Sequence, residues 1–272
     1  MAHKDVSYFS DGLKIAAALF VPDDYKDGEK RAGIVLLGGF TANKEMTLPD
    51  FAQPLNEAGY VVLTIDWRGF GASEGARGEV KPLERVEDVK SAVTYLALQP
   101  QVDKDKIGMV GICFGGGVAS YTAAFDKRIK CLAVPGVIAN GGTWIRSTRR
   151  LHEWADLLKR IEEDRNKRVI TGESEHVPVL EVAIPDPEVK EKFSMFQKQY
   201  KYAGYSPSLL CWETVINFRP EDVADKISPT PYLVFAAGKD TWADSVVNAM
   251  AMYQKAREPR KLVFYQIVPI LE

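Results

Sequence analysis

One cysteine stands between glycines in the segment MVGICFGGG, which covers residues 109–117. From Gly111 to Gly115 the chain reads Gly-Ile-Cys-Phe-Gly, a Gly-x-Cys-x-Gly pattern. The central residue of such a turn, between a strand and a helix, adopts a strained conformation with positive φ, and the glycines avoid collisions across the turn. The pattern predicts that Cys113 is a nucleophile and that the backbone N–H of Phe114 stabilises an oxyanion.

The position of Cys113 also suggests how its thiol is activated. A thiol at the N-terminus of a helix is expected to have a lowered pKa, because the helix dipole favours the thiolate. Three other interpretations of this segment compete with a nucleophile. A lone cysteine is most often a small core residue. A phosphate loop needs Lys followed by Ser or Thr after the glycines, whereas Val118 and Ala119 follow here. A dinucleotide fingerprint has another spacing and opens the first βα unit.

Two further segments fit an acyl-transfer site. LLGGF ends an early apolar run, and the N–H of Phe40 is expected to be the second oxyanion donor. AAGKDTWAD places Asp240 in a loop after a later strand, where the acid of a catalytic triad is expected; Asp244 is a weaker candidate. Trp67 and Trp242 follow strand ends, so we expect both to line a substrate pocket.

Short apolar runs alternate with amphipathic segments, which predicts a mostly parallel sheet with helices on both faces. The expected strands are Leu13–Pro22, Ala32–Phe40, Tyr60–Ile65, Ile129–Gly136, Tyr232–Ala236 and Arg260–Ile270, and DKIGMVGICFGGGVASYTAAF is expected to be strand, sharp turn and helix. Residues 139–220 are rich in charged and aromatic residues and are expected to form a helical cap insertion. The core would then comprise residues 1–138 and 221–272.

Composition narrows the class of protein. The chain has 272 residues, 46% hydrophobic and 26% charged, with a net charge of −2, so it carries no electrostatic signature of nucleic-acid or membrane binding. Three cysteines without paired spacing argue against a disulfide framework, and three scattered histidines argue against a zinc site. We expect no metal, no cofactor and a cytoplasmic location, since no signal peptide or membrane-length apolar run is visible. A homodimer is among the oligomeric states left open.

Taken together, the segments resemble the α/β-hydrolases, specifically the dienelactone-hydrolase-like and prolyl-dipeptidyl-peptidase-like group. The resemblance rests on LLGGFTANKE, DWRGFGASEG, GICFGGG, PTPYLVFAAGKD and AREPRKLVFY, in that order along the chain. It implies an α/β-hydrolase fold with a cap similar to those of fungal polyketide thiohydrolases and acyltransferases. Gly38 stands where the family usually has histidine, and the triad histidine expected after the last strand is not seen, because no histidine follows His176.

The missing histidine leaves several interpretations of the site. Either the chain is truncated, or the enzyme lacks the usual base, or a histidine of the cap, His152 or His176, takes the place of that base. The first hypothesis for function is a cysteine-dependent hydrolase of a small-molecule ester, lactone or thioester. The alternatives are an acyltransferase or cyclase on the same fold, and a binding protein on a catalytically impaired hydrolase scaffold.

Overall fold

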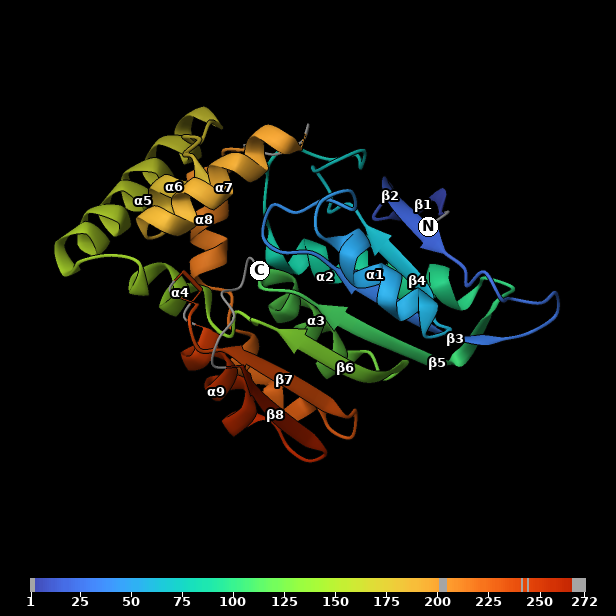
Figure 1. Ribbon diagram of the computed structural model, residues 1–272. Helices are drawn as coiled ribbons and strands as arrows, with labels where there is room; N and C mark the ends of the chain where they lie inside the picture. The colour runs from blue at the N-terminus through green and yellow to red at the C-terminus, as the bar shows by residue number, and fades with distance from the viewer. Residues whose placement is uncertain (1–2, 201–204, 241, 244, 266–272) are drawn as a thin grey trace.

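The computed structural model describes residues 3–200, 205–240, 242–243 and 245–265, with the backbone alone at 196–198. Within this part of the chain, eight strands form one sheet in the order β1-β2-β4-β3-β5-β6-β7-β8 (Figure 1). The strands are β1 (Lys4–Ser10), β2 (Leu13–Phe20), β3 (Arg31–Leu37), β4 (Val61–Ile65), β5 (Val102–Gly111), β6 (Ile129–Pro135), β7 (Tyr232–Ala237) and β8 (Arg260–Tyr265). The expected continuation of the last strand, over 266–270, lies outside the described residues.

Neighbouring strands are parallel throughout the part of the sheet that runs β4-β3-β5-β6-β7-β8, whereas β1 and β2 are antiparallel strands at one edge. The central strands are continuous apolar runs because both of their faces are covered; all five residues of β4 are buried. Strands β1 and β2 form a hairpin whose two-residue turn, Asp11 and Gly12, has φ values of 48° and 80°. Positive φ at both positions suits the twist of an antiparallel hairpin. The prediction of a mostly parallel sheet is confirmed, with this hairpin added to it.

Helices cover both faces of the sheet, as predicted. Contacts place α1 (Leu48–Glu57) against β3 and β4, and α2 (Pro82–Ala97), α3 (Phe114–Phe125) and α9 (Ser245–Lys255) against the strands as a second layer. Two separate apolar clusters result: α1 packs over Leu36 and Val62, and the larger core includes the alternate residues Val35 and Leu63. This division follows from the period of two in a strand.

A helical segment follows β6 and gathers at the end of the sheet toward which the parallel strands point (Figure 1). Its helices are α4 (Gly141–Ser147), α5 (Leu151–Thr171), α6 (Val179–Val182), α7 (Pro187–Gln199) and α8 (Leu209–Ile216), and a 3-10 helix, η1 (Pro220–Ile227), leads back to β7. Two of these helices begin at side-chain caps: Asn140 accepts the N–H of Thr143, and Ser208 accepts that of Cys211. These caps fix the residues at which α4 and α8 begin.

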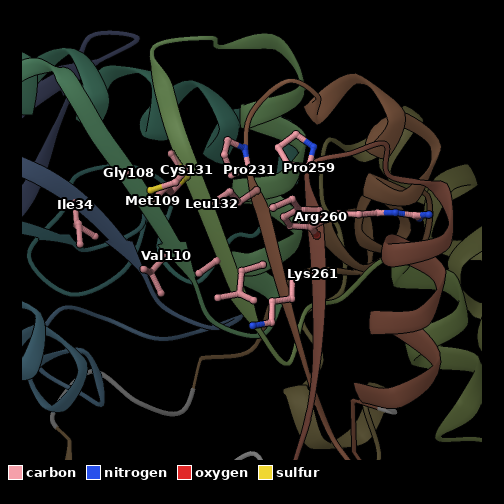
Figure 2. A pocket seen from close by; sticks show the side chains of 13 residues that line it. Ile34, Gly108, Met109, Val110, Cys131, Leu132, Pro231, Pro259, Arg260 and Lys261 are labelled. Atoms are coloured by element: carbon pink, nitrogen blue, oxygen red, sulfur yellow. The ribbon is translucent and has the colours of Figure 1, made fainter.

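An open apolar hollow of about 400 Å³ lies on the middle of the sheet (Figure 2). It is lined by residues of β3, β5, β6, β7 and β8, among them Ile34, Val110 and Leu132. Ile34 and Val110 share the strand face of Leu36, which carries α1. The predicted site residues do not line this hollow, so it is a feature of the sheet face and not of the strand ends.

Candidate active site

The turn between β5 and α3 has the strained geometry expected for a nucleophile. Cys113 has φ 55° and ψ −123°, and α3 begins at the next residue. Its N–H donates to the carbonyl of Pro135 at 3.0 Å, and its own carbonyl accepts the N–H of Gly116 at 2.9 Å. A cysteine with positive φ is held there at a cost of about 1–3 kcal/mol, which these hydrogen bonds help to offset.

The two flanking glycines are required by close packing. A Cβ on Gly111 would lie 2.5 Å from the carbonyl oxygen of Gly115, across the turn. A Cβ on Gly115 would lie 2.2 Å from the carbonyl oxygen of Gly38, which belongs to the loop after β3. The Gly-x-Cys-x-Gly spacing is therefore needed for the turn itself and for its contact with this loop.

The loop after β3 lies directly against Cys113. A Cβ on Gly39 would be 3.6 Å from that of Cys113, and the ring of Phe40 packs edge-on against the ring of Phe114 at 5.1 Å. The backbone N–H of Phe114 lies close enough to the thiol of Cys113 to lower its pKa. The structure thus brings together Cys113 and the two residues predicted to donate oxyanion N–H groups.

Asp240 lies in the loop after β7 and is buried. Its Oδ1 accepts the backbone N–H groups of Trp242 and Ala243, both at 3.1 Å. Asn248 on α9 fixes this loop further, since it donates to the carbonyl of Ala243 at 2.7 Å and accepts the N–H of Ala139 at 2.8 Å. Asp240 is close enough to Cys113 for its negative charge to act on the thiol. The weaker candidate, Asp244, lies outside the described residues.

The expected lowering of the Cys113 pKa is wrong for this structure. The side chain is partly exposed, but protein atoms surround the sulfur closely enough that burial, together with the charge of Asp240, raises its pKa to about 12. The hydrogen bond from Phe114 opposes this rise without cancelling it. The resting group is therefore a neutral thiol at neutral pH.

The three histidines have their described partners elsewhere. His3 packs against Phe20, with ring centroids 5.1 Å apart, and His152 is exposed near the start of α5. The Nδ1 atom of His176 lies 2.8 Å from the carbonyl oxygen of Ser206 and 3.6 Å from Glu79. The groups that set the pKa of the Cys113 thiol include Asp240 and Phe114 but none of these histidines.

The two tryptophans predicted to line the pocket lie in different surroundings. Trp67 is fully buried beneath the loop after β3, and its Nε1 donates to the carbonyls of Gly38 and Gly39. Trp242 is half-buried and donates to the carbonyl of Ala183 at 3.0 Å, so it connects the Asp240 loop to the helical segment.

A buried arginine beside this site was not predicted from the sequence. Arg85 on α2 is fully buried, and its Nη1 donates to the carbonyl of Phe40 at 2.7 Å. Its neighbours Val86 and Val89 indicate a helix. Because arginine is rarely buried without a partner, an arginine in a helix is expected at the surface, and the sequence gives no signal of a buried role.

The described part of the chain contains neither a candidate metal centre nor a candidate membrane-spanning helix. There, no group of three or more His, Cys, Asp or Glu side chains could hold a metal ion. No helix among those residues has the length and apolar character needed to cross a membrane.

A strained Cys between a parallel strand and a helix, N–H groups beside it and an acid after a later strand define an α/β-hydrolase type of site. The chain belongs to the α/β-hydrolase fold family, whose model matches residues 34–169. An uncharacterized 31.7 kDa protein of the traX-finO intergenic region of Escherichia coli is 31% identical over 76% of this chain and 72% of its own.

Two fungal proteins are similar over nearly the whole chain. Thiohydrolase aneE of Aspergillus aculeatus is 27% identical over 94% of this chain and 82% of its own, and polyketide transferase grgF of Penicillium sp. is 26% identical over 96% and 87%. The crystal structure of alpha/beta hydrolase GrgF from Penicillium sp. sh18 has a TM-score of 0.83 at 24% identity, covering all of this chain and 92% of that one. The family and these relatives support an enzyme.

Proposed function

We propose that this protein is an acyl-transfer enzyme that hydrolyses a small-molecule ester, lactone or thioester through a cysteine acyl-enzyme. The observation that carries the proposal is the strained turn at Cys113, with φ 55°, against which the loop of Gly39 and Phe40 is packed. In such a turn the nucleophile stands where neighbouring backbone N–H groups can receive an oxyanion, and this supports an acyl-transfer role for Cys113.

In the proposed reaction, the sulfur of Cys113 attacks the substrate carbonyl carbon. The S–C bond forms as the carbonyl π electrons move to oxygen, and the N–H groups of Phe40 and Phe114 hold that oxyanion. When the carbonyl re-forms, the bond to the alcohol or thiol leaving group breaks, and the leaving group takes the proton that the thiol lost. Water then attacks the thioester, the C–S bond breaks, and the acid and the thiol are regenerated. Asp240 is assigned the orientation of the base that carries this proton in both steps, and that base is not among the described groups that act on the thiol.

The decisive experiment is detection of the acyl-enzyme. Purified protein is incubated with p-nitrophenyl acetate and, separately, with a simple acyl thioester, and its intact mass and the labelled peptide are measured. We expect one acetyl group on Cys113 and its loss in Cys113→Ala. The control is Cys131→Ser, which removes an exposed cysteine on β6 and should leave labelling unchanged. If acetylation is absent, or survives in Cys113→Ala, the proposal is refuted, and a binding protein on this fold becomes the better interpretation.

The second candidate is transfer of the acyl group to an alcohol or amine. It is favoured by the likeness to a protein named as a transferase, polyketide transferase grgF. The acyl-enzyme would be the same, and only the acceptor in the second step would differ. Product analysis with and without a small amine or alcohol separates the two: an amide or ester product that forms faster than the free acid supports transfer.

A further inference from the structure

Three consecutive carbonyl groups of the loop after β3 accept hydrogen bonds from two buried side chains. The Nε1 of Trp67 donates to the carbonyl oxygens of Gly38 and Gly39 at 3.3 and 3.1 Å. The Nη1 of Arg85 donates to the carbonyl oxygen of Phe40 at 2.7 Å. Both side chains are fully buried. The core thus fixes this loop through its carbonyls, and the N–H of Ala42 adds a 3.4 Å bond to the carbonyl of Gly39.

The bond from Trp67 bears directly on the proposed oxyanion donor. The carbonyl of Gly39 and the N–H of Phe40 belong to one peptide group, which is planar and trans, so the two point in opposite directions. Holding the carbonyl toward Trp67 therefore directs the N–H of Phe40 to the opposite side. A donor on the carbonyl also polarises the peptide and strengthens the hydrogen bond that its N–H can give.

Arg85 holds the neighbouring carbonyl and also packs on Trp67. Its guanidinium carbon lies 4.7 Å from the ring centroid of Trp67 and 5.0 Å from that of Phe70. Its Nε and Nη2 have no hydrogen-bond partner in the described part of the chain. The rings offset part of the cost of burying this cation, but a buried charge with two unused donors is not a stabilising device. The bond from Nη1 to Phe40 is the specific interaction that the arginine supplies.

We propose that Trp67 and Arg85 are positioning residues of acylation: they fix the carbonyls of the loop so that the N–H of Phe40 meets the oxyanion of a substrate attacked by Cys113. The inference rests on the proposed function. It assigns no contact with substrate to either side chain, because both act through the backbone of Phe40.

The test compares two reactions of the same thiol. Alkylation of Cys113 by iodoacetamide displaces iodide at a saturated carbon and needs no oxyanion hole, whereas acylation by p-nitrophenyl acetate passes through an oxyanion. Both rates are measured at pH 8 on Trp67→Phe, which removes the indole donor with part of the ring, and on Arg85→Met, which removes the guanidinium and keeps an unbranched apolar stem. We expect the acylation rate to fall about tenfold and the alkylation rate to stay within about twofold. Removal of a whole oxyanion donor typically costs about 10²–10³-fold, and here the donor is misdirected but still present.

Trp144 supplies a matched control. It is a buried tryptophan whose ring lies 5.5 Å from that of Phe40, but its Nε1 donates to no described group. Trp144→Phe should leave the ratio of the two rates within about twofold of the wild-type value. An equal fall of the ratio in this variant would mean that packing around Phe40, and not the hydrogen bond from Trp67, sets the rate, and would overturn the inference.

The remaining outcomes are equally decisive. An unchanged ratio in folded Trp67→Phe and Arg85→Met overturns the inference while leaving the proposed function intact. A wild-type protein that is alkylated but never acylated at Cys113 refutes both. Arg85→Met should still fold, because it removes a buried charge that has no ion-pair partner among the described residues, which offsets the loss of the bond to the Phe40 carbonyl. If it fails to fold, Arg85 holds the fold and not the loop, and its assignment is wrong.

Discussion

Replacing Asp240 by asparagine should make the Cys113 thiol more reactive toward an alkylating agent. Burial is the largest cause of the high pKa of this thiol, the charge of Asp240 is the second, and the hydrogen bond from Phe114 opposes both. Removing the charge should lower the pKa below about 12. It should stay above the ordinary 9.0, because burial remains and outweighs the effect of Phe114.

The size of the acceleration follows from thiolate chemistry. At a pH well below the pKa, each unit by which the pKa falls raises the thiolate fraction tenfold, but the less basic thiolate is about threefold less nucleophilic. The net gain is about threefold per unit. Because the new pKa lies between 9.0 and about 12, alkylation of Asp240→Asn at pH 8 should be faster than that of the wild type by no more than about 30-fold.

The assay is iodoacetamide labelling between pH 7 and 10, quantified for each cysteine-containing peptide by mass spectrometry. In the wild type, the rate at Cys113 should rise about tenfold per pH unit with no plateau in this range. Cys131 is an internal control, since burial alone raises its pKa and the Asp240 charge is not among the causes. A wild-type plateau below pH 8, or slower alkylation of Cys113 in Asp240→Asn, would refute this account of the thiol.

Three further substitutions test a close contact at the Cys113 turn and two hydrogen-bonded carboxylates elsewhere in the fold. Gly115→Ala would place a Cβ 2.2 Å from the carbonyl oxygen of Gly38 and should cost about 3 kcal/mol in urea unfolding; a wild-type midpoint would contradict the contact. Asp164→Asn removes a carboxylate that accepts three hydrogen bonds at 2.7 Å in the helical segment and should cost about 1–3 kcal/mol. The fold lowers the pKa of the Asp164 carboxyl, so this group contributes fully to the free energy of unfolding above the unfolded-state pKa of about 4. That contribution is lost as the pH falls through the folded-state pKa, so the stability difference between Asp164→Asn and the wild type should shrink toward pH 3. Glu79→Gln weakens the 2.7 Å bond from the Ser208 hydroxyl that ties α8 to the core, so limited proteolysis of 139–216 should accelerate, and an unaltered digestion pattern would argue against this tie.

The parts of the fold that the sequence predicted are those set by local signals. The buried strands are short apolar runs bounded by glycine, proline or charged residues, and the parallel arrangement follows from their alternation with helices. The first strand, β1, escaped notice because its residues, Lys4–Ser10, alternate between exposed and buried at a sheet edge and carry little apolar character. Pairing at that edge is decided by the turn at Asp11 and Gly12.

For the candidate site, the sequence predicted which residues follow the strand ends, but it did not predict the direction in which the pKa of Cys113 is shifted. Three glycine-bounded segments place Cys113, Phe40 and Asp240 at strand ends, and parallel strands bring such ends to one edge. The pKa of Cys113 depends on how many protein atoms surround the sulfur and how close Asp240 comes, which are tertiary quantities. The role of Arg85 depends on a contact across 45 residues, and no local pattern encodes it.

The same burial acts in opposite ways on the two halves of the proposed reaction. It raises the pKa of Cys113, so the thiolate is scarce at neutral pH and proton removal is the harder step. It also strengthens the N–H groups of Phe40 and Phe114 as oxyanion donors, because hydrogen bonds to a developing charge are worth more where water is excluded. A site built this way favours substrates that form the oxyanion readily and expel a weakly basic leaving group. Thioesters and activated esters have that character, so they should be turned over faster than alkyl esters bearing the same acyl group.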